Sequence, residues 1–230
     1  MWLHASILKF YSIQCMCIWI CILCSQFAKA SPLLNTDDTE ITSYGHCQLE
    51  SAIVPSKNAG TSYQLNPACQ LVKGVESGVG YTQNNLDSNS YGVSAQLKTV
   101  IKALDTWGVA GSLSVSQNKT AIGDSVDWFL NMPFAWVLAD TPIHLYTNVG
   151  YQYSKQHADL VKWSAAASYQ LNSKASITLE AFNQDQKSPF FQSVFQYSII
   201  PDLLTFEASF GQRMEAFRQR WFGFGLSFTP

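Results

Sequence analysis

Hydrophobic and polar residues alternate along most of the chain, most clearly in its last eleven residues. There Phe222, Phe224, Leu226 and Phe228 occupy every second position, and glycine or serine lies between them. Successive side chains of a β-strand point to opposite faces, so this segment predicts a strand with one apolar face and one small, polar face. The same alternation predicts twelve strands, at residues 45–54, 61–71, 75–83, 90–101, 107–118, 125–138, 143–154, 160–171, 175–183, 191–200, 203–212 and 220–230.

Short and long connections alternate between these strands. Five connections are sharp turns and six are longer and polar, so both chain ends fall on the side of the sharp turns. This is the arrangement of antiparallel up-and-down barrels in bacterial outer membranes, whose short turns face the periplasm. A ten-stranded barrel remains an alternative, if residues 45–71 form a separate hairpin-like lid.

Composition bears on which face of the barrel is apolar, since a soluble barrel or sandwich shows the same alternation. The chain is 47% hydrophobic and 13% charged. The predicted outward set has almost no charge, whereas a solvated surface carries about a quarter to a third charged residues. The inward set is rich in Gly, Ser, Gln and Asn, which suits a wet lumen better than a dry core. We therefore predict a transmembrane β-barrel over residues 45–230, with outer-membrane lipid around it.

The first thirty residues have the features of a secretory signal peptide. Lys9 precedes an apolar run at residues 10–23, and Ala28-Lys29-Ala30 is a small-x-small cleavage site. Cleavage after Ala30 makes Ser31 the first mature residue. Residues 31–44 are polar and acidic, and we predict that they form a loose periplasmic N-terminal tail.

Cys47 and Cys69 are the two cysteines outside the predicted signal peptide. Each lies eleven residues from position 58, in the turn-like stretch at residues 55–60, and both fall on the outward parity. In a hairpin centred there, their side chains face each other across the two strands. An exported protein with an even cysteine count favours a disulfide over two buried thiols.

The leader, the alternating body and the aromatic final strand resemble those of bacterial outer-membrane β-barrel proteins. More narrowly, residues 66–81, N-P-A-C-Q-L-V-K-G-V-E-S-G-V-G-Y, resemble a strand–turn–strand unit of the outer-membrane transporters linked to the meta pathway of phenol degradation. The resemblance implies about twelve strands, a place in the outer membrane, and insertion by the barrel-assembly machinery. One departure is that Phe228 is followed by Thr229 and Pro230, whereas substrates of that machinery usually end on an aromatic residue.

Several charged residues share the inward parity, and a charge facing lipid would cost several kcal/mol near the membrane midplane. These residues either brace the barrel through ion pairs or line it and select solutes. Their acidic excess would favour cations or neutral solutes. With one inward histidine, the candidate lumen residues are Glu50, Glu76, Lys98, Asp127, His144, Lys162, Glu180 and Glu207.

The sequence shows no motif for catalysis, metal binding or a cofactor, and no basic patch for nucleic acid. We therefore expect no enzymatic activity, cofactor or nucleic-acid partner. Twelve strands leave a narrow lumen, between the filled eight-stranded and the wide sixteen-stranded barrels. The first hypothesis is a small channel or passive transporter for a small solute of unknown identity. The alternatives are a closed-lumen barrel with a structural or surface-interaction role and, third, a membrane-embedded hydrolase.

Overall fold

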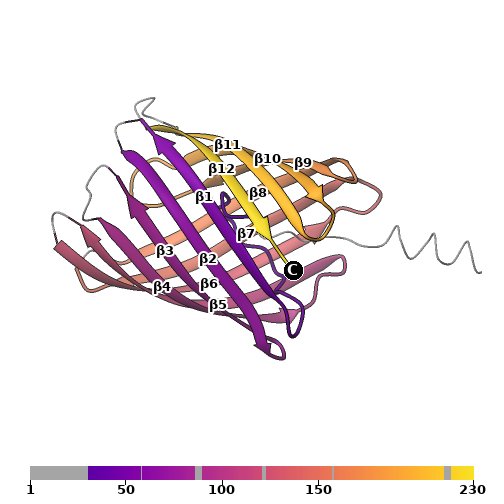
Figure 1. The fold of residues 1–230 in the computed structure, drawn as a ribbon, viewed down its shortest axis with the longest axis horizontal. Helices are drawn as coiled ribbons and strands as arrows, with labels where there is room; N and C mark the ends of the chain where they lie inside the picture. The colour runs from indigo at the N-terminus through magenta and orange to yellow at the C-terminus, as the bar shows by residue number, and fades with distance from the viewer. Residues whose placement is uncertain (1–30, 58, 86–89, 121–122, 157, 215–218) are drawn as a thin grey trace, which may run out of the picture.

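The computed structural model describes residues 31–57, 59–85, 90–120, 123–156, 158–214 and 219–230. Within these residues the chain forms twelve antiparallel strands in one closed barrel (Figure 1), as the alternation predicted. Within the described residues there is no helix long and apolar enough to cross a membrane. The strands are β1 (Cys47–Ser56), β2 (Gly60–Val72), β3 (Val75–Asn84), β4 (Tyr91–Lys102), β5 (Trp107–Thr120), β6 (Gly123–Val137), β7 (Ile143–Ser154), β8 (Leu160–Asn172), β9 (Ala175–Phe182), β10 (Phe190–Ile200), β11 (Leu204–Arg213) and β12 (Arg220–Phe228).

The first two strands belong to the barrel wall. β1 pairs with β2 on one side and with β12 on the other, which closes the sheet and shows that the ten-stranded alternative is wrong. Cys47 is the direct register partner of Cys69, with 4.0 Å between their Cα atoms, and the two form a disulfide. The predicted pairing is therefore confirmed.

The two rims of the barrel differ in the length of their connections. The short-turn rim carries both ends of the strand series, before β1 and after β12, and the tight turns between paired strands such as β2 and β3. Gly74 and Asp202 have positive φ there, of 84° and 64°, which glycine adopts freely and aspartate tolerates. The loop rim carries the longest connection, between β9 and β10, but β5 and β6 are separated by only two residues there because strand pairing extends to Thr120 and Gly123, so the long connection predicted at residues 119–124 is wrong.

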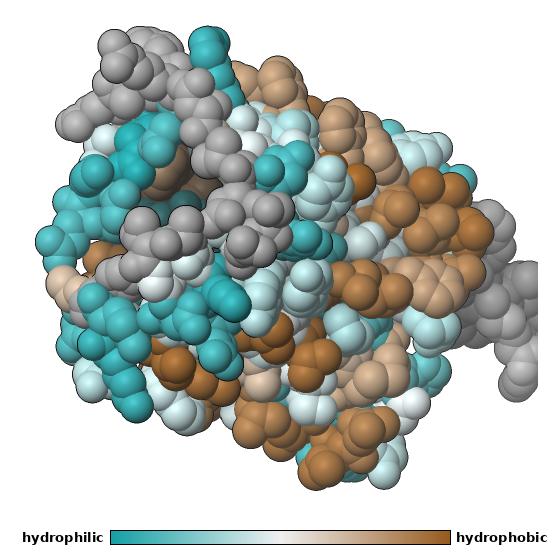
Figure 2. All heavy atoms as spheres, turned by 60° about the vertical axis from the view of Figure 1, so that its left-hand side comes forward, coloured by the Kyte–Doolittle hydropathy of each residue, from teal (hydrophilic) through white to brown (hydrophobic). Residues whose placement is uncertain are grey.

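The outer wall is apolar and the inner wall is polar. On β6, Trp128, Leu130 and Met132 are 45%, 61% and 45% exposed, whereas Asp127 and Asn131 on the opposite face are buried. Figure 2 shows hydrophobic side chains spread over the barrel wall and hydrophilic ones gathered at the end on the left of the view. This is the distribution expected of a barrel whose wall contacts lipid and whose interior is wet.

Residues 31–42, here called the inner segment, run inside the barrel before β1 (Figure 1). Leu33, Thr36, Thr39 and Thr42 are buried there. This differs from the loose tail predicted for residues 31–44. Polar residues inside a barrel find partners on the inward faces of strands distant in the sequence, which local composition does not reveal. The predicted signal peptide, with Ala30, lies outside the described residues.

Candidate functional site

A buried lysine anchors the middle of the inner segment. The ammonium of Lys98 on β4 lies 2.7 Å from a carboxylate oxygen of Asp37 and 2.8 Å from one of Asp38. The Lys98 side chain is only 7% exposed, so water screens these pairs little. The Asn148 amide, oriented to satisfy its neighbours, also spans the backbone of Asp37, accepting from its N–H at 2.8 Å and donating to its carbonyl at 2.9 Å. Side chains of two separate strands thus fix one point of the segment.

Three inward carboxylates accept hydrogen bonds from the same segment. Glu76 accepts from the backbone N–H of Thr42 at 2.7 Å and also from its hydroxyl. Glu180 accepts from the backbone N–H of Thr36. Glu207, fully buried, accepts from the Ser31 hydroxyl at 2.7 Å. Because the segment lacks regular secondary structure, Glu76 and Glu180 replace the backbone partners that two of its N–H groups would otherwise need.

Small inward residues make room for the segment. A Cβ added at Gly225 would lie 2.8 Å from Pro32 Cγ, and one at Gly223 would lie 2.8 Å from a methyl carbon of Leu33. Leu33 packs there against Ala52 and other small apolar side chains. The glycines that alternate with phenylalanine in the last strand therefore create the space in which the segment lies.

The structure places all eight candidate lumen residues on the inner wall, and half of them, Glu76, Lys98, Glu180 and Glu207, contact the inner segment. Among the described residues, the other four make no hydrogen bond or ion pair to the inner segment. Asp127 accepts from the Asn118 amide at 3.1 Å, and the Lys162 ammonium lies 5.1 Å from the centre of the Phe129 ring. His144 Nδ1 lies 3.3 Å from the Tyr146 hydroxyl. Glu50 is half-buried on β1.

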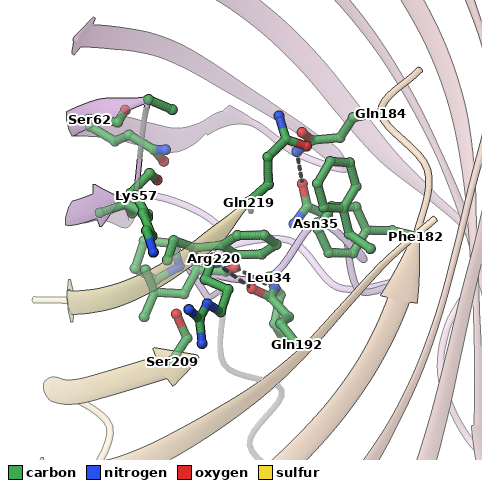
Figure 3. A pocket seen from close by; sticks show the side chains of 18 residues that line it. Leu34, Asn35, Lys57, Ser62, Phe182, Gln184, Gln192, Ser209, Gln219 and Arg220 are labelled. Atoms are coloured by element: carbon green, nitrogen blue, oxygen red, sulfur yellow. Dashed lines mark hydrogen bonds between the residues drawn. The ribbon is translucent and has the colours of Figure 1, made fainter. Parts of the chain in front are cut away.

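A cavity of about 380 Å³ lies between the bend of the inner segment and the loop rim, here called the loop-side pocket (Figure 3). The wall formed by the segment contains Leu34 and Asn35, and the Asn35 amide oxygen accepts from Gln184 at 3.2 Å. The side chains from the barrel wall that define its chemistry are Lys57, Ser62, Gln64, Phe182, Phe190, Gln192, Ser209, Arg220 and Trp221. The pocket thus combines aromatic rings, amides, hydroxyls and two cations.

A second ion pair fixes the loop next to this pocket. The Arg213 guanidinium donates to both carboxylate oxygens of Asp185, at 3.1 and 2.7 Å, and lies 4.2 Å from the centre of the Phe190 ring. These hydrogen bonds lower the pKa of Asp185 below its ordinary value. The connection between β9 and β10 is therefore tied to the end of β11.

Sequence reasoning missed the inner segment, the pocket and the role of Arg213. The sequence did contain one signal for the inner segment. Lys98 has inward parity and therefore needs a counter-charge inside the barrel, and the adjacent pair Asp37-Asp38 could supply it. The pocket left no comparable signal, because its walls come from both chain ends and from β9 and β10. In the part of the chain that is described, no three metal-ligating side chains gather at one point.

A family profile described as "Uncharacterised conserved protein UCP029691" matches residues 19–228. The chain belongs to this family. The profile does not assign the chain to the transporters linked to the meta pathway of phenol degradation, which residues 66–81 resemble. No curated protein matches the chain in sequence.

Solved structures share the fold at low sequence identity. A KdgM porin in complex with disordered oligogalacturonate has a TM-score of 0.66 and 9% identity, over 79% of this chain and 98% of that one. An outer-membrane channel from Pseudomonas putida F1 has a TM-score of 0.58 and 9% identity, over 88% and 100%. Outer-membrane phospholipase A from Escherichia coli has a TM-score of 0.51 and 11% identity, over 88% and 94%. The protein therefore has the closed-barrel fold of outer-membrane porins.

Proposed function

We propose that this protein is a channel for small solutes in a bacterial outer membrane, and that its inner segment narrows the lumen. The observation that carries this proposal is a closed barrel with an apolar outer wall and a polar interior, in which a segment of the same chain is held by Lys98. An apolar wall of this kind is stable in lipid and would be costly in water. The narrowed interior limits the passage to small molecules.

The remaining parts of the proposal concern orientation, export and insertion. The short-turn rim would face the periplasm and the loop rim the outside, after export by a signal peptide and insertion by the barrel-assembly machinery. The likeness to a KdgM porin and to a Pseudomonas putida channel supports a transport role. The narrower hypothesis of a transporter linked to phenol degradation rests on residues 66–81 alone.

The second candidate is a barrel whose lumen is closed to solutes, and the anchored inner segment specifically favours it. Such a protein would act through its loops rather than its lumen. We do not propose hydrolysis, because the inward His144 contacts the Tyr146 hydroxyl rather than a serine, and the likeness to the Escherichia coli phospholipase is one of fold.

Planar-bilayer recordings of the folded mature protein and of a variant lacking residues 32–42 would test the proposal. We expect small single-channel currents from the wild type and larger ones from the variant, since the deletion removes the segment from the lumen. Heat-modifiable gel migration verifies that both are folded. Absence of current from both proteins would refute the channel. If the wild type passes no current and the variant does, the result would favour the barrel with a closed lumen.

A further inference from the structure

We propose that the loop-side pocket binds a small organic anion with a ring-shaped body, its charge held by Lys57 and Arg220 and its ring packed on Trp221. As a statement about the transported solute, the proposal rests on the proposed channel function. As a statement about binding, it is independent of conduction.

Lys57 and Arg220 form a pair of neighbouring cations at the mouth of the pocket. Lys57 follows β1 and Arg220 begins β12, and the backbone N–H of Lys57 donates to the carbonyl of Arg220 at 2.8 Å. Both side chains are exposed and line the pocket (Figure 3). Among the residues that the structure describes, neither side chain makes a hydrogen bond or an ion pair. Two adjacent cations that have no counter-charge among the described residues favour an anionic ligand.

The distribution of carboxylates confines this preference to the pocket. The described residues that line it include neither aspartate nor glutamate. Glu180 lies directly behind this lining, where it accepts from the Gln192 amide. Glu76, Glu180 and Glu207 accept hydrogen bonds from the inner segment, so these lumen carboxylates serve partly to hold the segment.

Trp221 provides a fixed ring surface. Its indole lies over Gly211, where an added Cβ would come within 2.1 Å of the ring, and its N–H donates to Gln192 at 3.3 Å. The rings of Phe190 and Phe182 meet it at angles of 63° and 61°, with centroids 5.6 and 6.3 Å away. A tryptophan held on these sides presents its remaining surface to the pocket, where a flat or ring-shaped body packs well.

An unpartnered hydroxyl lies beside the pocket. Ser209 is 7% exposed and lines the pocket, and its buried Oγ has no hydrogen-bond partner among the described residues. Ser62 and Gln64 on β2 add further polar groups to the lining. The cavity of about 380 Å³ is at the lower end of the range of small-molecule sites. A small anion with additional polar atoms fits these features.

Isothermal titration calorimetry of the full mature protein, folded in detergent, would test the proposal with sodium benzoate and sodium glucuronate as probes. Benzamide and methyl glucoside are the matched neutral compounds. We expect at least one anion to bind more tightly than its neutral counterpart. Binding of benzoate would indicate a flat aromatic body, and binding of glucuronate a hydroxylated ring; either result supports the site.

The variants locate the binding. Replacing both cations, Lys57→Gln with Arg220→Gln, should weaken binding about tenfold at low salt and less at high salt, because exposed charge pairs are weak and screened. Trp221→Ala should weaken binding, and Trp221→Phe should restore part of it. Lys155→Gln, at the loop rim but outside the pocket, is the matched control and should bind as the wild type does.

Two results would overturn the proposal: no binding of either anion to the folded wild type, or undiminished binding by the double variant. Calorimetry does not require an open lumen, so this test and the conductance test can fail separately. Anion binding by a protein that never conducts would support the pocket proposal and refute the channel proposal. Conduction without anion binding would refute the pocket proposal and support the channel proposal.

Discussion

Replacing Lys98 with methionine should release the inner segment while leaving the barrel folded. Lys98 makes ion pairs with Asp37 and Asp38 at 2.7 and 2.8 Å, and methionine keeps much of its length without its charge. The substitution leaves two neighbouring carboxylates inside the lumen without their cation. The strand pairing of β4 with β3 and β5 does not depend on this side chain.

The expected size of the effect follows from the burial of the three groups. Removing one partner of a buried ion pair costs about 3–5 kcal/mol, whereas an exposed pair contributes about 0–1 kcal/mol. The Lys98 side chain is 7% exposed, but Asp37 and Asp38 are 31% and 19% exposed. We therefore take the lower end, about 3 kcal/mol, which corresponds to about a hundredfold increase in the population of the released segment.

A cysteine at position 39 reports this release. Thr39 is 1% exposed, and the native cysteines are joined in a disulfide, so Thr39→Cys introduces one protected thiol into the described chain. Its labelling rate with a water-soluble maleimide is proportional to the released population when opening and closing are fast. We expect the rate to rise about a hundredfold in Lys98→Met.

Two controls distinguish the loss of the Lys98 ion pairs from a nonspecific effect of substitution on the fold. Lys155→Met removes an exposed lysine at the loop rim and should leave the labelling rate unchanged. Adding Asp37→Asn and Asp38→Asn to Lys98→Met should lower the rate again, since no unpaired carboxylate remains. A change of less than threefold in Lys98→Met, with heat-modifiable migration intact, would contradict the anchoring role of the lysine.

Three further predictions concern the wall, the space for the segment and the loop. Leu130→Arg, at the middle of β6, should destabilise the vesicle-inserted barrel by about 2–4 kcal/mol in urea titrations, and Leu138→Arg at the rim by about 0–1 kcal/mol; equal costs would argue against a lipid-facing wall. Gly225→Val should also speed labelling at position 39, because its side chain would overlap the inner segment; an unchanged rate would count against the packing described. Hydrogen bonds from Arg213 lower the pKa of Asp185. The loop contact should therefore be complete above the ordinary aspartate pKa of about 3.9 and be lost only as the pH falls through the lower folded value. A carboxyl-carbon NMR titration of Asp185 that ends at or above the ordinary pKa would disprove this.

The barrel wall was predictable from sequence because its signal is local. Alternation on each strand reports which side chains face outward, and register follows from the turns, so strand positions and the Cys47–Cys69 disulfide could be inferred. The inward position of charges such as Lys98 follows from the same parity, since a charge facing lipid is costly.

The inner segment was not predictable because its partners lie far away in the sequence. Residues 31–42 carry no alternation, and their acidic, hydroxyl-rich composition is also that of a flexible tail. Their burial depends on Glu76, Lys98 and Glu180, which three different strands bring to one lumen. The glycines at alternate positions of β12 predicted a small inner face without indicating what would lie on it.

The most direct test of the account is a current recording on a barrel whose inner segment is cross-linked to the wall. Asp38→Cys with Lys98→Cys places one thiol on the segment and one on the wall, separated by about the length of the lost lysine side chain, so a bifunctional thiol reagent with a reducible disulfide linker is used to span them. We expect this reagent to cross-link the membrane-inserted protein, a low single-channel current while the linker is intact, and a higher current after its reduction. The wild type controls for reduction of its own disulfide. A folded, inserted protein that forms no cross-link, or whose current is the same before and after reduction, would contradict a lumen controlled by residues 31–42.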